Sequence, residues 1–104
     1  MSLQAAGFDW DQGNRAKCQK HGISIAEIEV LFASRPRVAS DLKHSAVEDR
    51  FVAVGRNAQG RPMFVVFTLR QVESSTLIRP LSARYMHRRE IESYEEEGSE
   101  ADER

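Results

Sequence analysis

The fold is decided by the stretch FVAVGRNAQGRPMFVVFTLR, residues 51–70. Its first part, 51–56, alternates apolar side chains between two sides, which is the period-two pattern of a strand. Residues 57–60 then have the composition of a hairpin turn, in which Gly60 allows the positive φ that the returning chain needs. The return, 62–70, is apolar on both sides for most of its length, as in a central strand. The stretch therefore predicts an antiparallel hairpin whose second strand is buried within a sheet.

Shorter strand candidates flank this hairpin in the sequence. Residues 37–40 come before it, and residues 76–82 follow it after a polar connection, 71–75. Pro80 has no N–H to donate to a neighbouring strand, so the last strand should lie at an edge or bulge at that residue. Near the N-terminus, residues 8–10 form either a further strand or an anchored extended segment. We therefore expect an antiparallel sheet of about four strands.

Two helices are predicted before the sheet. The first runs from about Gln12 to His21 after Asp11, which suits the N-cap position, and its sequence is mostly polar. The second begins with a capping box, in which the side chains of Ser24 and Glu27 each satisfy a backbone amide at the start of the helix. Pro36 ends it, because proline cannot continue a helix.

A third helix is predicted after Ala83, where ring and apolar side chains recur at helical spacing and would pack on the sheet. These are His87, Ile91 and Tyr94. Residues 97–104 are predicted to be an acidic, disordered tail. The whole pattern predicts an α+β fold with two N-terminal helices, an antiparallel sheet and a C-terminal helix. Residues 1–96 would form a single domain, because 104 residues are too few for two cores.

The composition excludes several classes of protein. The longest unbroken apolar run, residues 63–67, is far too short to span a bilayer, and no targeting signal is visible. We therefore expect a cytoplasmic protein without a membrane partner. A single cysteine, Cys18, excludes an internal disulfide. The histidines and Cys18 lack the spacing of a metal site, and there is no glycine-rich phosphate loop. We expect neither a metal nor another cofactor.

Charge is unevenly distributed along the chain. Between residues 50 and 94 there are eight arginines and three glutamates, whereas residues 95–104 carry six acidic residues and one arginine. Arginine presents a planar fork that binds phosphate through two hydrogen bonds, which lysine does not offer. The basic body is therefore compatible with a polyanionic substrate. Histidine, arginine and lysine are also the groups that metal-free RNA cleavage needs for proton transfer and charge stabilisation.

Separate blocks along nearly the whole chain, about residues 7–96, resemble the signatures of BrnT toxins. They occur in the order of that family: FDWD at 8–11, GN at 13–14, KCQKHG at 17–22, HS at 44–45, VGR at 54–56, FVVFTLR at 64–70 and RPLSARYMH at 79–87. The resemblance implies a RelE-like fold and an endoribonuclease toxin of a type II toxin–antitoxin system. It also implies a cognate BrnA-type antitoxin with a ribbon-helix-helix module, so DNA would be reached only through the antitoxin.

Nine residues are candidates for a site that cleaves RNA. We expect Arg79 and Arg84 to stabilise the transition state, and His21 and His44 are candidates for proton transfer. The candidates for RNA or phosphate contacts are Lys17, Lys20, Arg56, Arg70 and Tyr85. For several of them a structural role is the alternative: a helix-end histidine at 21, a loop histidine at 44, a salt-bridged arginine at 56 and a packed ring at 85.

Two functions are compatible with these residues. The first is metal-independent cleavage of mRNA that arrests growth when the antitoxin is lost. The alternative is a catalytically silent module of the same fold, which binds RNA or the antitoxin without cutting. The two differ in chemistry rather than in fold, so the sequence leaves both open at this point.

Overall fold

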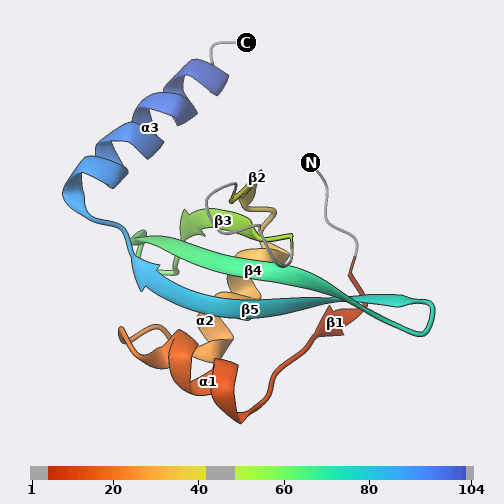
Figure 1. The fold of residues 1–104 in the computed structure, drawn as a ribbon. Coiled ribbons are helices and arrows are strands. Elements are labelled where there is room, and N and C mark those ends of the chain that lie inside the picture. The colour runs from red at the N-terminus through yellow and green to blue at the C-terminus, as the bar shows by residue number, and fades with distance from the viewer. Residues whose placement is uncertain (1–4, 42–48, 103–104) are drawn as a thin grey trace.

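The computed structural model describes residues 5–41 and 49–102 of the chain. Within these residues the fold is α+β, with a single mixed sheet in the order β1-β5-β4-β3-β2 (Figure 1). The strands are β1 (Gly7–Phe8), β2 (Arg37–Ser40), β3 (Phe51–Arg56), β4 (Pro62–Val72) and β5 (Ser75–Tyr85). Strands β2 to β5 are antiparallel, as predicted. The short β1 adds a fifth strand that runs parallel to β5.

The hairpin between β3 and β4 turns where the sequence predicts it. The side-chain Oδ1 atom of Asn57 accepts hydrogen bonds from the backbone N–H groups of Gln59 and Arg61, at 3.0 and 2.8 Å. Gly60 adopts a φ of +79°, a conformation that a side chain would disfavour. The predicted turn is therefore confirmed.

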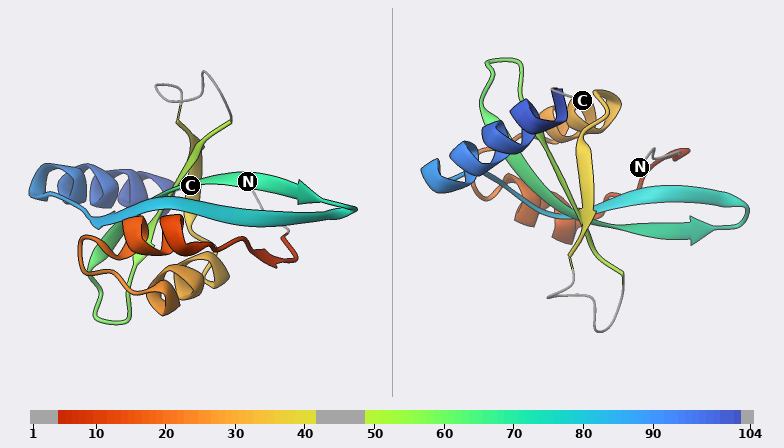
Figure 2. Two further views of the ribbon diagram at one scale, coloured as in Figure 1. Left: turned by 60° about the horizontal axis from the view of Figure 1, so that its bottom comes forward. Right: turned by 90° about the horizontal axis from the view of Figure 1, so that it is seen from above.

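The hairpin between β4 and β5 is longer than predicted and projects beyond the rest of the sheet (Figure 2). The two strands stay paired as far as Val72 and Ser75, so most of the connection predicted at 71–75 is strand. Glu73 forms part of the turn with a φ of +56°. Hydrophobic alternation could not reveal this extension, because the exposed tip is polar and its strands pair through their backbones.

Two helices, α1 (Gln12–Gln19) and α2 (Ile25–Ala33), lie together on one side of the sheet (Figures 1 and 2). Both predicted N-caps are confirmed, because the side chains of Asp11 and Ser24 each accept a backbone hydrogen bond from the first turn of their helix. α1 is shorter at its C-terminal end than predicted. The chain turns toward α2 at Gly22, which has a φ of +89°.

The start of the C-terminal helix corrects the sequence prediction. β5 continues as a strand through Tyr85, and α3 (Arg88–Asp102) begins only after it. Arg84 pairs with Phe64 across the β4–β5 ladder, so it lies within the sheet and does not open the helix. His87 is exposed, so its predicted packing on the sheet is wrong. β4 offers a backbone partner for this whole segment, and this pairing overrides the local helical pattern.

α3 leaves the end of β5 on the side of the sheet away from α1 and α2 (Figure 2). It is helical through Asp102. The predicted division of the chain into a domain at 1–96 and a tail at 97–104 stays a prediction.

The hydrophobic core lies between the sheet and the layer of α1 and α2. Every second residue of β4 from Met63 to Phe67 is fully buried, and Ile28 and Leu31 of α2 belong to the same cluster. The residues between them, Phe64 and Val66, are only half-buried, because alternation along the strand points them to the other side. We call this other side the open face; its apolar residues in β3 and β4 are Val52, Val54, Phe64 and Val66.

The irregularity predicted at Pro80 is confirmed as a bulge in β5. Leu81 is the extra residue, opposite the step between Val66 and Phe67. Side chains of a regular strand alternate between its faces, so Arg79 and Arg84, an odd number of positions apart, would otherwise point in opposite directions. The extra residue restores them to one side. The open face therefore receives both arginines from a single strand.

β3 and α2 are in close contact at Gly55, where an added Cβ atom would overlap the Cδ1 atom of Leu31. Leu31 is only 1% exposed, so its side chain has no open space to enter. We expect Gly55→Ala to lower the free energy of unfolding by about 1–3 kcal/mol through overpacking. Urea unfolding measures the loss. Leu31→Val removes the overlapping atom and should reduce the cost of Gly55→Ala; an equal cost in both backgrounds would contradict this origin.

Candidate functional site

A groove with cationic walls crosses the open face of the sheet beside α1. It consists of two adjoining cavities of about 500 and 460 Å³, whose linings share Lys17, Arg50 and Leu81. Arg79 lines the first cavity and Arg84 the second. Apolar residues of the open face, Val52, Phe64 and Val66, also line the second. We call this the cationic groove and define it by Lys17, Arg50, Arg79 and Arg84.

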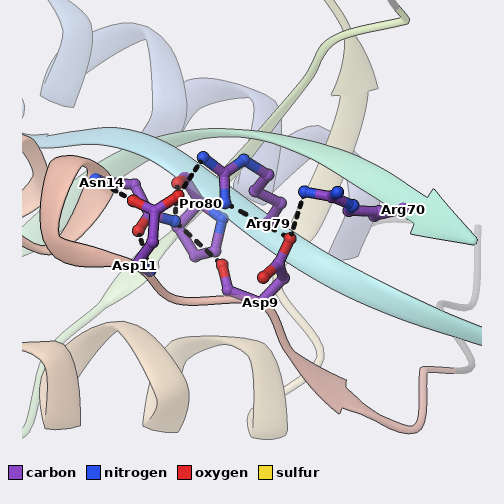
Figure 3. Close-up of polar contacts among 6 residues, drawn as sticks. All are labelled: Asp9, Asp11, Asn14, Arg70, Arg79 and Pro80. Carbon is purple, nitrogen blue, oxygen red and sulfur yellow. Dashed lines mark hydrogen bonds and ion pairs between the residues drawn. The ribbon is translucent and has the colours of Figure 1, made fainter. Parts of the chain in front are cut away.

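The N-terminal turn of α1 is fixed to the sheet by the side chain of Asn14, which is only 5% exposed. Its Nδ2 atom donates hydrogen bonds to the carbonyl oxygens of Asp9 and Pro80, each at 2.9 Å (Figure 3). Its Oδ1 atom accepts the backbone N–H of Asp11 at 2.7 Å. These bonds tie the start of α1 to the bulge of β5. They thereby hold Lys17, less than one turn further along the helix, at the wall of the groove.

Arg79 is held by two carboxylates from the segment before α1 (Figure 3). Its Nη2 atom donates to Asp11 at 2.7 Å, and its Nη1 atom lies 3.3 Å from Asp9. Hydrogen bonds from the backbone N–H of Asn14 and then from Arg79 lower the pKa of Asp11, and the same contact with Asp11 raises the pKa of Arg79. Arg70 shares Asp9 at 3.1 Å. An arginine inside a strand is costly unless its charge is paired, and these ion pairs offset that cost.

Arg84 lies against the apolar floor of the groove. Its guanidinium carbon is 4.5 Å from the centre of the Phe64 ring, a distance suited to a cation–π contact. Both of its terminal nitrogens bind Glu90 of α3, at 2.7 and 2.8 Å. This bidentate hydrogen bonding raises the pKa of Arg84, so its charge is fixed at every relevant pH.

Arg50 is a groove residue that was not among the nine candidates. It lines both cavities and immediately precedes β3, where its carbonyl oxygen accepts the backbone N–H of Asp41 at 2.8 Å. The period-two pattern of β3 could have identified this residue from the sequence. Position 50 is in step with Val52 and Val54, which face the groove side of the sheet.

The structure does not bring all of the predicted residues into the groove. Lys20 and His21 are exposed beyond the end of α1, and neither lines the two cavities. His44 lies outside the described residues. Among the eight candidates that the structure describes, the groove therefore unites Lys17, Arg79 and Arg84, with Arg70 beside it.

Two further candidates lie elsewhere on the sheet. Tyr85 points to the side of α2: its hydroxyl donates to Glu27 at 3.4 Å, and the guanidinium carbon of Arg61 lies 3.6 Å from its ring centre. Arg56 lies at the end of β3 and pairs with Glu95 of α3 at 3.0 Å. A packed ring at 85 and a salt-bridged arginine at 56 were the structural alternatives for these two positions.

Other kinds of site find little support within the described part of the chain. No group of three His, Cys, Asp or Glu side chains gathers there as a metal site. Burial raises the pKa of the Cys18 thiol to about 11, which keeps this group protonated and unreactive near neutral pH. No helix within residues 5–41 and 49–102 is both long and apolar enough to cross a membrane.

The ion pair between Glu90 and Arg84 predicts a specific dependence of stability on pH. Hydrogen bonds from Arg84 and from the backbone N–H of His87 lower the pKa of Glu90 from 4.5 to about 2. A lowered pKa means that the stabilisation is complete above pH 4.5 and is lost as the pH falls through about 2. The difference in unfolding free energy between the wild type and Glu90→Gln should therefore be constant near neutral pH and shrink in acid. A difference that persisted below pH 2 would contradict this.

Comparison with known proteins connects this geometry to a family. No curated protein matches the chain. A family model described as a ribonuclease toxin, BrnT, of type II toxin–antitoxin systems matches residues 10–90. The matched range includes all four residues that define the cationic groove. Because the match spans well over half of the sequence, the chain belongs to the BrnT family of ribonuclease toxins of type II toxin–antitoxin systems.

Proposed function

We propose that this protein is a metal-independent endoribonuclease that cleaves mRNA in the cationic groove. One observation carries the proposal: Lys17, Arg50 and Arg84 converge from different parts of the chain on one groove with an apolar floor. Cationic walls suit the phosphates of a nucleic acid, and an apolar floor suits an unstacked base. Membership of a ribonuclease toxin family supports the same substrate.

The proposed reaction uses the 2′-hydroxyl of the RNA itself as nucleophile. A base removes its proton while the oxygen attacks the adjacent phosphorus, and the bond from phosphorus to the 5′-oxygen of the next nucleotide breaks. An acid protonates that leaving oxygen, so the products are a 2′,3′-cyclic phosphate and a free 5′-hydroxyl. Lys17, Arg50 and Arg84 would stabilise the negative charge that builds up on the phosphorane. These side chains can supply the charge that a metal would otherwise provide.

Proton transfer is assigned to His44 and His21. Arg70 and Arg79 would contact phosphates at the end of the groove near Asp9, and Lys20 would assist beyond α1. Histidine is suited to either proton role because its ordinary pKa lies near neutrality.

Cleavage of a synthetic RNA by the purified protein tests this proposal. We expect products that end in a 2′,3′-cyclic phosphate, identified by mass spectrometry, and an unchanged rate in the presence of EDTA. Loss of cleavage with EDTA would indicate a metal-dependent nuclease instead. Binding of RNA without any cleavage would support the alternative of a catalytically silent binding module.

We further propose that a BrnA-type antitoxin with a ribbon-helix-helix module neutralises the toxin in the cytoplasm and provides the only contact with DNA. The type II description of the family supports an antitoxin partner. A short ribbon-helix-helix reading frame beside this gene, whose product copurifies with the chain and relieves its growth arrest, is the expected finding. Growth arrest that such a product leaves unchanged would argue against this partner.

A further inference from the structure

We propose that α3 is an autoinhibitory segment: it occupies arginines of the open face with its own carboxylates, and it must move away before RNA binds them. The inference rests on the proposed function, since it takes RNA to be the ligand of the open face. The protein would then have two states: one in which α3 covers these arginines, and one in which α3 no longer contacts the sheet and the site is accessible.

The first contact is between Glu90 and Arg84. The carboxylate engages both terminal nitrogens of the guanidinium, at 2.7 and 2.8 Å. These nitrogens are the fork through which arginine binds a phosphate. With Glu90 in place, a phosphate could approach only the remaining part of the group. Glu90 therefore takes the position on Arg84 that RNA would need.

The second contact lies one turn further along α3, where Tyr94 and Glu95 meet two arginines of the sheet. Arg56 pairs with Glu95 at 3.0 Å. The guanidinium carbons of Arg37 and Arg56 lie 4.3 and 5.6 Å from the ring centre of Tyr94. A flat ring next to an anion is also what a nucleotide presents to guanidinium groups. α3 thus presents to the open face the same combination of groups as the proposed substrate.

The packing beneath α3 suggests that the segment can be released. A cavity of about 330 Å³, lined by residues that include Val54, Phe64 and Met86, separates the helix from the sheet. The groups that hold α3 are partly exposed, with side-chain exposures of 33% for Glu90 and 57% for Glu95. Partly exposed ion pairs contribute only modestly to stability, and an interface with an unfilled cavity adds little packing. α3 is therefore held in place by polar contacts that an RNA strand could replace.

The test compares the wild type with the double variant Glu90→Gln/Glu95→Gln. Glutamine keeps the size of each side chain and the acceptor for the N–H of His87, but it removes the charge. The matched control is Glu73→Gln/Glu92→Gln, which removes the same charge at two exposed positions: Glu73 lies in the β4–β5 turn, and Glu92 faces Arg88 on α3. The probe is a fluorescein-labelled single-stranded RNA with 2′-O-methyl riboses, which cannot undergo cleavage by 2′-hydroxyl attack.

We call Glu90→Gln/Glu95→Gln the latch variant, because it removes the two carboxylates that hold α3 on the sheet. We expect it to bind this RNA about tenfold more tightly than the wild type. It should also cleave ordinary RNA faster at subsaturating concentrations. The control should stay within about twofold of the wild type. Amide hydrogen exchange should also become faster at residues 91–95 in the latch variant only. This second readout reports the release of α3 without reference to RNA.

Three outcomes would overturn the inference. If the latch variant bound no more tightly than its control while the wild type bound and cleaved RNA, α3 would not be inhibitory and the proposed function would stand. If cleavage by the latch variant fell, Glu90 would be a positioning residue for Arg84. If none of the proteins bound RNA, although their α3 amides exchanged as expected, the proposed function and the inference would both fail.

Discussion

Arg84→Ala should reduce kcat/KM for RNA cleavage about 100-fold or more, with no comparable loss of folding stability. Arg84 is the arginine of the groove that lies on its apolar floor, 4.5 Å from the Phe64 ring. A charge in such a partly desolvated position stabilises a developing anion more strongly than one in open water. Cleavage under single-turnover conditions measures the effect, and circular dichroism confirms that the variant is folded.

Two further variants complete this test: one shows whether the geometry or only the charge of Arg84 is needed, and the other is a control. Arg84→Lys keeps the charge but loses the planar fork, so we expect it to recover only part of the activity. Arg88→Ala is the matched control, because the Arg88 side chain is 94% exposed and its ion pair, with Glu92, is loose at 3.7 Å. An activity loss in Arg88→Ala equal to that in Arg84→Ala would show that the groove is not the site.

Phe67→Ala should have the largest effect on stability, a loss of about 3–5 kcal/mol in the free energy of unfolding. Phe67 is fully buried in β4. Its ring packs edge-on against Phe32 of α2 at 4.9 Å between centres, and it lies 5.5 Å from Phe51 of β3. Its removal leaves a cavity where helix and sheet meet. A chain of this size has little stability in reserve, so the variant should be partly unfolded at 37 °C.

Urea unfolding followed by circular dichroism measures this loss. Val72→Ala is the control on the same strand: Val72 is 45% exposed near the tip of the hairpin, and the change should cost less than about 0.5 kcal/mol. If Phe67→Ala were as stable as Val72→Ala, the hydrophobic core would not lie on the side of the sheet that α1 and α2 cover.

Local chemistry was sufficient to predict much of this fold. The turn that ends at Gly60 and the helix caps at Asp11 and Ser24 depend on neighbours within a few residues, and all three are confirmed. The boundary between β5 and α3 could not be predicted in this way. Arg84 and Tyr85 belong to a helical pattern in sequence, but the far end of the preceding strand, β4, supplies their backbone partners. An extended segment was predicted at residues 8–10, but β1 is only Gly7–Phe8, too short for periodicity to fix its bounds or its partner.

The candidate site was predicted in part, for a related reason. Residue type and position were enough to select Lys17, Arg79 and Arg84, which the structure places around one groove. Their partners could not be predicted, because Arg79 meets carboxylates some 70 positions away in sequence, at Asp9 and Asp11. These contacts give Arg79 a structural role in addition to the proposed one.

The bulge in β5 makes the relative orientation of Arg79 and Arg84 depend on the number of residues between them rather than on the type of residue at the bulge. Many side chains could occupy position 81 without moving its neighbours, since the extra residue has no partner in β4. Loss of the position itself would rotate one part of the strand by half a turn relative to the other. Arg79 and Arg84 would then face opposite layers of the molecule. Divergent members of such a family should therefore tolerate exchanges at this point of the strand, whereas insertions and deletions there should be absent.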